Sequence, residues 1–173
     1  MPRMFSDFIG DFGPEGGYLL VRKPVLAQIG LQSREIHSGN ETGGILIGSY
    51  RGHHIDITSS TVQQSKDVAS RFRFHRKDKN HHGIAMKAWE QSGGFQTYLG
   101  EWHSHPEAHP TPSGIDASSW IRATEAIGKK MVFIIVGRQS TWIGYTYFDR
   151  KKCMIGRSKP AKPFVAADTL VQN

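Results

Sequence analysis

The pattern of apolar and polar residues along the chain predicts short strands that alternate with three helices. Apolar runs bounded by Gly or polar turns predict strands over 18–21, 41–48, 54–58, 97–102, 131–136 and 142–148. Apolar residues three and four positions apart predict helices from Pro24 to about Gly39, from Ile84 to Gly93 and from Ser113 to Ile127. This alternation predicts an α/β fold in which helices flank a β-sheet.

Three segments lack this periodicity. Residues 1–16 are rich in Gly, Asp, Pro and Phe and predict an N-terminal arm that docks through its three aromatic side chains, Phe5, Phe8 and Phe12. Residues 65–83 are polar and basic and predict a loop. Residues 151–173 are basic, contain Pro and predict a loosely held C-terminal tail. A single compact domain over 17–150 is therefore expected between the arm and the tail.

Composition narrows the class of protein without naming a function. The chain has 173 residues, a formal net charge of +7, nine His and one Cys. A single Cys excludes a disulfide framework and a Cys-rich zinc site, and it favours a reducing cytoplasm. No apolar run approaches the ~20 residues of a membrane span, and no secretory signal is expected at the N-terminus. The positive charge allows an acidic protein partner, whereas nucleic acid is not expected because no recognised binding fold accompanies it.

Two histidines, His103 and His105, stand where the strand predicted over 97–102 ends. Alternate residues of a strand point to the same face with Cβ atoms roughly 6–7 Å apart, so both imidazoles can reach one ion. Asp116 falls in the first turn of the helix that begins at Ser113, and its carboxylate can face back toward the strand end. Two imidazoles and one carboxylate are the ligand set of a hydrolytic zinc ion that keeps a fourth position for water.

Each of these features also has a structural explanation. Ser113 and Asp116 fit a helix capping box in which Asp replaces Glu or Gln. Two histidines at this spacing, taken alone, fit exposed or structural positions. The capping and metal-binding interpretations are compatible, because a capping Ser still presents its hydroxyl to a site.

The candidate general base is Glu41, at the start of the strand predicted over 41–48. A neighbouring strand could bring its carboxylate to a zinc-bound water, whose pKa the metal lowers toward about 7. Glu41 would accept the proton and pass it to a leaving amine. Gly43 and Gly44 allow an adjoining backbone to approach closely. The alternative for Glu41 alone is an exposed position at a sheet edge.

These residues match the signature of the JAMM metalloproteases, also called MPN-plus or Mov34/PAD-1-like domains. The signature is Glu, then His-x-His-x7-Ser-x2-Asp. Here it consists of Glu41, His103-Ser104-His105, seven residues, Ser113, two residues and Asp116. The chain resembles this family over about residues 17–150.

The resemblance implies a cytidine-deaminase-like α/β fold with a mixed sheet and one Zn2+ ion. It implies that His103, His105 and Asp116 bind the ion and that Glu41 holds the catalytic water. It also implies that the Ser113 hydroxyl stabilises the oxyanion of the tetrahedral intermediate, a role typically worth a few kcal/mol.

The resemblance further implies a deconjugating zinc protease. Family members hydrolyse isopeptide bonds to ubiquitin or ubiquitin-like proteins, and the expected partner is such a protein or its conjugate. The short chain, with Trp120 after the start of the Asp116 helix, is similar to the JAMM proteins of bacterial antiphage (CBASS-type) systems, which act beside activating and conjugating enzymes. Some prokaryotic relatives instead cut small peptides or release a sulfur-carrier tail, and others are non-catalytic scaffolds. Both remain alternatives.

Three further features carry no assigned role. Glu101 shares a strand face with His103 and His105, where it either orients a ligand or lies on the surface. The basic stretch 71–82, with interleaved aromatic residues, fits either a solvated loop or a substrate-facing loop that binds an acidic protein surface. Cys153 has no His at motif spacing, so a nucleophilic role is not expected.

Overall fold

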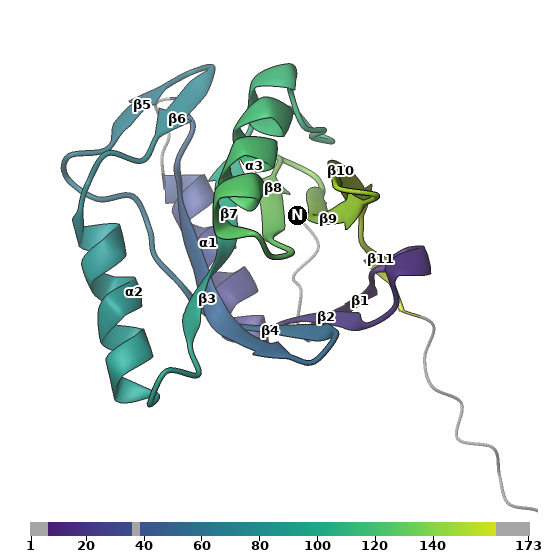
Figure 1. Cartoon of the computed structure of the whole chain (residues 1–173). Helices are drawn as coiled ribbons and strands as arrows, with labels where there is room; N and C mark the ends of the chain where they lie inside the picture. The colour runs from purple at the N-terminus through teal and green to yellow at the C-terminus, as the bar shows by residue number, and fades with distance from the viewer. Residues whose placement is uncertain (1–6, 36–38, 162–173) are drawn as a thin grey trace, which may run out of the picture.

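A nine-stranded mixed sheet carries three helices on its two faces (Figure 1). The computed structural model describes residues 7–35 and 39–161. The strands of the sheet are β1 (Phe8–Asp11), β2 (Tyr18–Val21), β3 (Gly43–Arg51), β4 (His54–Ser60), β7 (Thr97–Ser104), β8 (Val132–Val136), β9 (Thr141–Asp149), β10 (Lys152–Arg157) and β11 (Lys159–Pro160). The helices are α1 (Lys23–Glu35), α2 (Asn80–Gln91) and α3 (Gly114–Ile127). This arrangement confirms the expected α/β fold.

The sheet is mixed, with the order β10-β9-β8-β7-β3-β4-β2-β1-β11. The pairs β7–β8 and β2–β4 are parallel, whereas β3 pairs antiparallel with both β4 and β7. A parallel pair needs a crossover connection, and α3 and α1 lie in those two connections. The central strand of this order is β3, and β7 lies beside it, between β3 and β8.

Strand β8 shows how the two faces are covered. Its residues Val132, Ile134 and Val136 join the core cluster that contains Val25 and Ile29 of α1. The alternate residues Phe133 and Ile135 join a second cluster with Trp120 of α3. Because successive strand residues point to opposite faces, α1 covers one face and α3 the other. Helix α2 packs on the same face of the sheet as α3, where Ala85 contacts Ile45 and Ile47 of β3.

A bulge in β7 determines which of its residues face α3. The register with β3 shifts so that Leu46 pairs with Gly100 and Ile47 with Tyr98, leaving Leu99 extra. Leu99 and Trp102 therefore both lie in the α1-side core. At Gly100 a Cβ would collide with the backbone of Val132, so the bulge requires glycine there. Beyond the bulge, the alternate residues on the other face include His103.

Both ends of the described chain belong to the sheet; the expected docking of the arm is confirmed at Phe8 and Phe12, which pack into the α1-side core, but the arm is also a strand of the sheet. β1 pairs with β2, and Phe12 of the arm is fully buried and packs edge-on against Tyr145. The expectation of a loosely held tail is wrong for 152–160, because β10 pairs with β9 and β11 pairs with β1. β10 and β11 are consecutive in the chain yet form the two edges of the sheet, so the sheet curves until its edges lie near each other (Figure 1). Phe5 and residues 162–173 fall outside the described residues.

The remaining differences concern 65–83 and the helix ends. The expected loop contains a hairpin of β5 (Val68–Ser70) and β6 (Arg73–His75), and α2 begins earlier than predicted, at Asn80. The apolar residues on which the α2 prediction rested, Ile84, Met86 and Trp89, are exposed. Helix α1 is described to Glu35, so Ile36 falls outside the described residues. No helix in the described part of the chain is long and apolar enough to cross a membrane.

Candidate functional site: a His-His-carboxylate centre

The two histidines of the signature converge at the end of β7. His103 lies in the strand, and His105 continues the pairing because its N–H donates to the carbonyl of Val136 in β8. Their Nε2 atoms lie 2.9 Å apart, and their rings are 4.8 Å apart between centroids. The sequence prediction that both imidazoles reach one point is confirmed by these distances.

Helix α3 brings Asp116 to the histidines. Ser113 is the N-cap of the helix, and its hydroxyl accepts the N–H of Asp116 while the Asp116 carboxylate accepts the N–H of Ser113 at 2.7 Å. This is the predicted capping box. The same carboxylate places Oδ1 3.3 Å from Nε2 of His103 and Oδ2 3.5 Å from Nε2 of His105. The capping and site interpretations therefore hold together in one geometry.

Glu41 reaches the centre from the segment that precedes β3. Ser104, the residue between the two histidines, exchanges two hydrogen bonds with Thr42: its hydroxyl accepts the Thr42 N–H at 3.0 Å, and its N–H donates to the Thr42 carbonyl at 2.8 Å. The Glu41 N–H donates to Ser70 of the β5–β6 hairpin. Glu41 is buried, and its Oε1 lies 3.9 Å from Nε2 of His105. The alternative of an exposed edge Glu is wrong.

Two glycines permit this close approach. A Cβ on Gly43 would lie 2.5 Å from the Trp102 carbonyl and 2.7 Å from the Phe74 ring. A Cβ on Gly44 would collide with the Thr61 carbonyl. The glycines after Glu41 therefore let the hairpin and β7 close around the carboxylate, as the sequence predicted.

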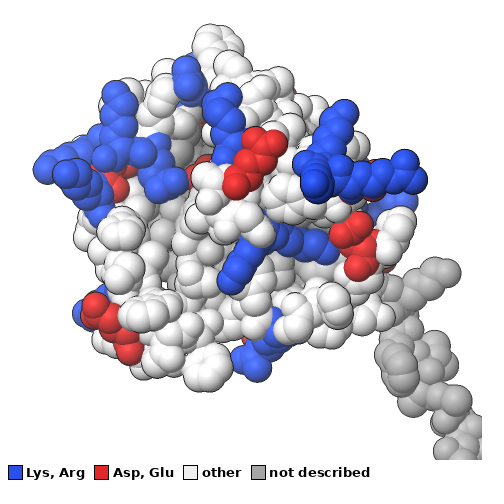
Figure 2. Space-filling view, in the orientation of Figure 1, with Lys and Arg blue, Asp and Glu red and all other residues white. Residues whose placement is uncertain are grey.

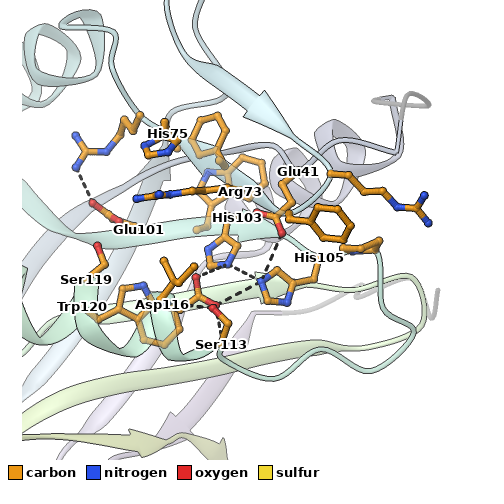
Figure 3. A pocket seen from close by; sticks show the side chains of 18 of the residues that line it. Glu41, Arg73, His75, Glu101, His103, His105, Ser113, Asp116, Ser119 and Trp120 are labelled. Carbon is orange, nitrogen blue, oxygen red and sulfur yellow. Dashed lines mark hydrogen bonds and ion pairs between the residues drawn. The ribbon is translucent and has the colours of Figure 1, made fainter.

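The donor atoms fit a small tetrahedral metal ion. With metal–ligand distances of about 2.0–2.1 Å, neighbouring ligand atoms of a tetrahedral site lie roughly 3.3 Å apart. The two Nε2 atoms lie 2.9 Å apart, and the two Asp116 carboxylate oxygens lie 3.3 Å from His103 and 3.5 Å from His105, respectively, values close to that spacing. One ligand atom from each of Glu41, His103 and His105 also lies within 4.8 Å of the others. Two carboxylates thus flank the imidazole pair, with Asp116 nearer (Figure 3).

The surroundings of the two carboxylates shift their pKa values in opposite directions. Burial raises the pKa of Glu41 above its usual value, although the charges of His103 and His105 act in the opposite direction. Burial also acts to raise the pKa of Asp116, but hydrogen bonds from His103, His105 and Ser113 outweigh it and hold the pKa well below its usual range. Asp116 is consequently the stronger candidate for a permanently anionic ligand, and Glu41 is the better proton acceptor.

Sequence reasoning missed Glu107, which orients a histidine. Its Oε2 lies 3.2 Å from Nδ1 of His105, the ring nitrogen that faces away from the centre. A carboxylate on the far nitrogen fixes the ring and its tautomer. Burial lowers the pKa of His105, yet the hydrogen bonds to Asp116 and Glu107 and the charge of Glu41 outweigh it and raise that pKa. The signal in the sequence was an acidic residue two positions after the second His.

Glu101 has a different role from the one considered for it. Its Oε1 accepts a hydrogen bond from Arg76 at 2.6 Å and from the Tyr98 hydroxyl at 2.9 Å, and neither histidine contacts it. The ion pair between Glu101 and Arg76, the residue after β6, connects the hairpin to strand β7. Glu101 therefore holds the hairpin over the site and does not orient a ligand.

The centre lies in a cleft of about 420 Å³. One wall is the β5–β6 hairpin with its connecting residues, and the other is the first half of α3. Trp120 forms part of the helix wall: it stacks on Phe133 and Trp142 at 4.4 and 5.4 Å, and its ring lies 6.3 Å from that of His103. Figure 3 shows the labelled side chains of the two walls on either side of the imidazole pair.

Comparison with known families decides the assignment. Residues 22–147 match the family Prok-JAB, described as prokaryotic homologs of the JAB domain. The chain belongs to this family. Membership of Prok-JAB confirms the resemblance to JAMM/MPN proteins that rested on Glu41 and the His-x-His motif, and with it the enzyme class of JAMM-type isopeptidases and metalloproteases.

The Prok-JAB chain is similar to curated bacterial proteins over most of its length. It is 37% identical over 137 residues to a protein of Escherichia coli, covering 79% of this chain and 85% of the relative. It is 36% identical over 142 residues to a protein of Vibrio cholerae, covering 82% and 90%. Both relatives are named CD-NTase/cGAS isopeptidase. The solution structure of a protein from Desulfitobacterium hafniense shares the fold, with a TM-score of 0.54 at 18% identity over 79% of this chain and 88% of that one.

Proposed function

We propose that this protein is a zinc isopeptidase that releases a conjugated CD-NTase-like protein from its target. The observation that carries the proposal is the convergence of His103, His105 and Asp116 at ligand spacing with Glu41 behind them. The names of the relatives from Escherichia coli and Vibrio cholerae support the substrate class. Enzymes that activate and conjugate the substrate are the expected partners, and the cytoplasm is the expected location.

Each residue has a distinct task in this proposal. His103, His105 and Asp116 would hold the ion, which when bound would supply Lewis-acid polarisation and activation of a water. Glu41 accepts a proton from the attacking water as the new C–O bond forms at the isopeptide carbonyl. It then donates that proton to the amine as the C–N bond breaks, so that the products are a free carboxylate and a free lysine. The raised pKa of Glu41 suits both halves of this transfer.

Ser113 is the proposed oxyanion donor. Its hydroxyl donates to Oδ2 of Asp116 at 2.7 Å, so donation to an oxyanion requires the hydroxyl proton to rotate away from that carboxylate. The Asp116 oxygen keeps the Ser113 N–H as a partner when this happens. Ser113→Ala is therefore expected to lower kcat by about 10²-fold or more, the usual loss for one oxyanion donor, while KM changes little.

The test combines metal analysis with a cleavage assay. The substrate is a CD-NTase-like protein joined through its C-terminal carboxyl to the lysine of a fluorescent peptide. Purified protein is expected to carry one zinc per chain and to release the peptide. Glu41→Gln should keep the zinc and lose about 10²–10⁴-fold in rate, and His103→Ala should lose the zinc. Glu90→Gln, an exposed change on α2, is the matched control.

Four results would overturn the proposal. Full activity without metal would remove the mechanism, and full activity of Glu41→Gln would remove the assigned base. Cleavage of free peptides as fast as the folded conjugate would favour the small-peptide or sulfur-carrier alternative. Zinc binding without any hydrolysis would leave the scaffold alternative.

A further inference from the structure

The two walls of the cleft form a groove that leads to the metal centre. On the helix wall, Ile115, Ser119 and Arg122 are exposed and spaced four and three residues apart, so they share one face of α3. On the opposite wall, Arg71 and Phe72 connect β5 to β6, and Arg73 is the first residue of β6. Figure 1 shows the hairpin and the upper end of α3 side by side, with the hairpin at the upper left.

Each carboxylate that lines the groove lies near a basic side chain, whereas most of the arginines there have no acidic partner in the described part of the chain. Of the four carboxylates in the groove, Glu41 and Asp116 face the histidines, Glu107 bonds to His105, and Glu101 is paired with Arg76. Three arginines line the same groove without an acidic partner among the described residues: Arg71, Arg73 and Arg122. Figure 2 shows one group of Lys and Arg side chains over the hairpin, at the upper left, and another on the right of the molecule.

We propose that this groove selects conjugates whose C-terminal tail carries acidic side chains close to the scissile bond. Arg73 on the hairpin wall and Arg122 on the helix wall are the specificity-determining residues. The inference deepens the proposed function and rests on it. It makes the basic stretch around residue 73 a substrate-facing segment.

The shape of the groove favours the tail over the target protein as its occupant. An isopeptide joins an extended C-terminal tail to a lysine side chain that projects from a folded surface. A slot between two walls admits an extended chain, whereas a folded surface can only rest on the rims. Phe72 and Ile115, 81% and 57% exposed, stand on opposite walls and offer apolar contact to such a chain between its charged residues.

Charge complementarity of this kind gives selectivity in both directions. A carboxylate between the two walls gains from guanidinium groups on either side, and a bidentate pair is the geometry in which Arg binds carboxylate best. A lysine in the same place meets like charge, which costs affinity. The affinity for tails with neutral side chains should lie between the affinities for acidic and for basic tails.

The probes are short peptides that end in Gly, joined through that carboxyl to the lysine of a fluorescent reporter peptide. Three versions carry Glu, Ser or Lys at two positions before the Gly. With the unaltered protein, the Glu version should be cleaved with a kcat/KM about ten-fold above the Lys version, and added salt should narrow the difference. Arg73→Glu and Arg122→Glu should each reduce the preference, and the double variant should reverse it.

A binding measurement separates this inference from the proposed function. Fluorescence polarisation with Glu41→Gln reports whether the groove prefers acidic peptides even if no peptide is hydrolysed. Lys87→Glu, the same charge change on the exposed side of α2, should leave the preference intact. Equal binding of the Glu and Lys versions would overturn the inference and leave the isopeptidase proposal standing. Tighter binding of a thymidine oligonucleotide than of the Glu peptide would also overturn it and reassign the groove to nucleic acid.

Discussion

Replacing His81 by Ala should destabilise the fold although His81 lies outside the metal centre. His81 is fully buried in the first turn of α2. Its Nε2 lies 2.7 Å from Oδ2 of Asp67, and its Nδ1 lies 2.6 Å from the Thr61 hydroxyl, which itself accepts the N–H of Ile45 in β3. The network is consistent when Nε2–H donates to Asp67 and the Thr61 hydroxyl donates to Nδ1. It ties α2 and the segment before the hairpin to the sheet.

The magnitude follows from the two bonds that the substitution removes. A buried hydrogen bond to a carboxylate contributes about 1.5–3 kcal/mol, and one between neutral groups about 0.5–1.5 kcal/mol. Asp67 keeps three backbone N–H donors, from Gln64, Lys77 and Asp78, so its charge is not stranded. His81→Ala should therefore lower the free energy of unfolding by about 3 kcal/mol.

Urea unfolding followed by circular dichroism measures this loss. With a slope of about 1–3 kcal/mol per molar urea, the midpoint should fall by about 1–3 M at an unchanged slope. His82→Ala, at the exposed neighbouring position, should change the free energy of unfolding by no more than about 0.5 kcal/mol. A loss below about 1 kcal/mol for His81→Ala would refute the reasoning from buried hydrogen bonds.

Three other changes test separate parts of the structure. Glu107→Gln removes the carboxylate behind His105 and should weaken zinc affinity by about 10–100-fold in a chelator competition, with the unfolding midpoint unchanged. Gly43→Ala forces a Cβ against the ring of Phe74 and should lower kcat without removing zinc, because it displaces the segment that carries the base. A chain that ends at Arg150 loses β10 and β11 and should elute as an aggregate in size-exclusion chromatography, whereas one that ends at residue 161 should elute as the whole chain does.

The convergence of the candidate metal ligands could be predicted from the sequence because local geometry brings them together. Alternation along a strand brings His103 and His105 together, and a capping box turns Asp116 back toward them; neither requires knowledge of distant contacts. The position of Glu41 beside the histidines was harder to predict from the sequence. It depends on the hydrogen bonds between Thr42 and Ser104, which are 62 positions apart in the chain. Glu107 was missed because its role depends on the ring orientation of His105.

Periodicity predicted the strands that are buried. It did not predict the strands that only long-range pairing defines. The run at 131–136 is buried on both faces and was found directly. β1 and β11 show no strand pattern in the sequence: β1 is defined by its pairing with β2, and the two-residue β11 by its pairing with β1. The bulge at Gly100 likewise reflects the nearby backbone of Val132, which no local pattern shows.

The pairing of β11 with β1 has a consequence for synthesis on the ribosome. Gly10 pairs with Pro160, so β1 keeps one unpaired edge until almost the whole described chain has emerged. At about 5–20 residues per second, that interval lasts roughly ten to thirty seconds. Throughout it, β1 offers an open edge to other nascent chains, and β9 offers a second one from its own synthesis until β10 follows. The segment after Arg150 thus ends the period in which this protein is most exposed to mispairing, a task unrelated to catalysis.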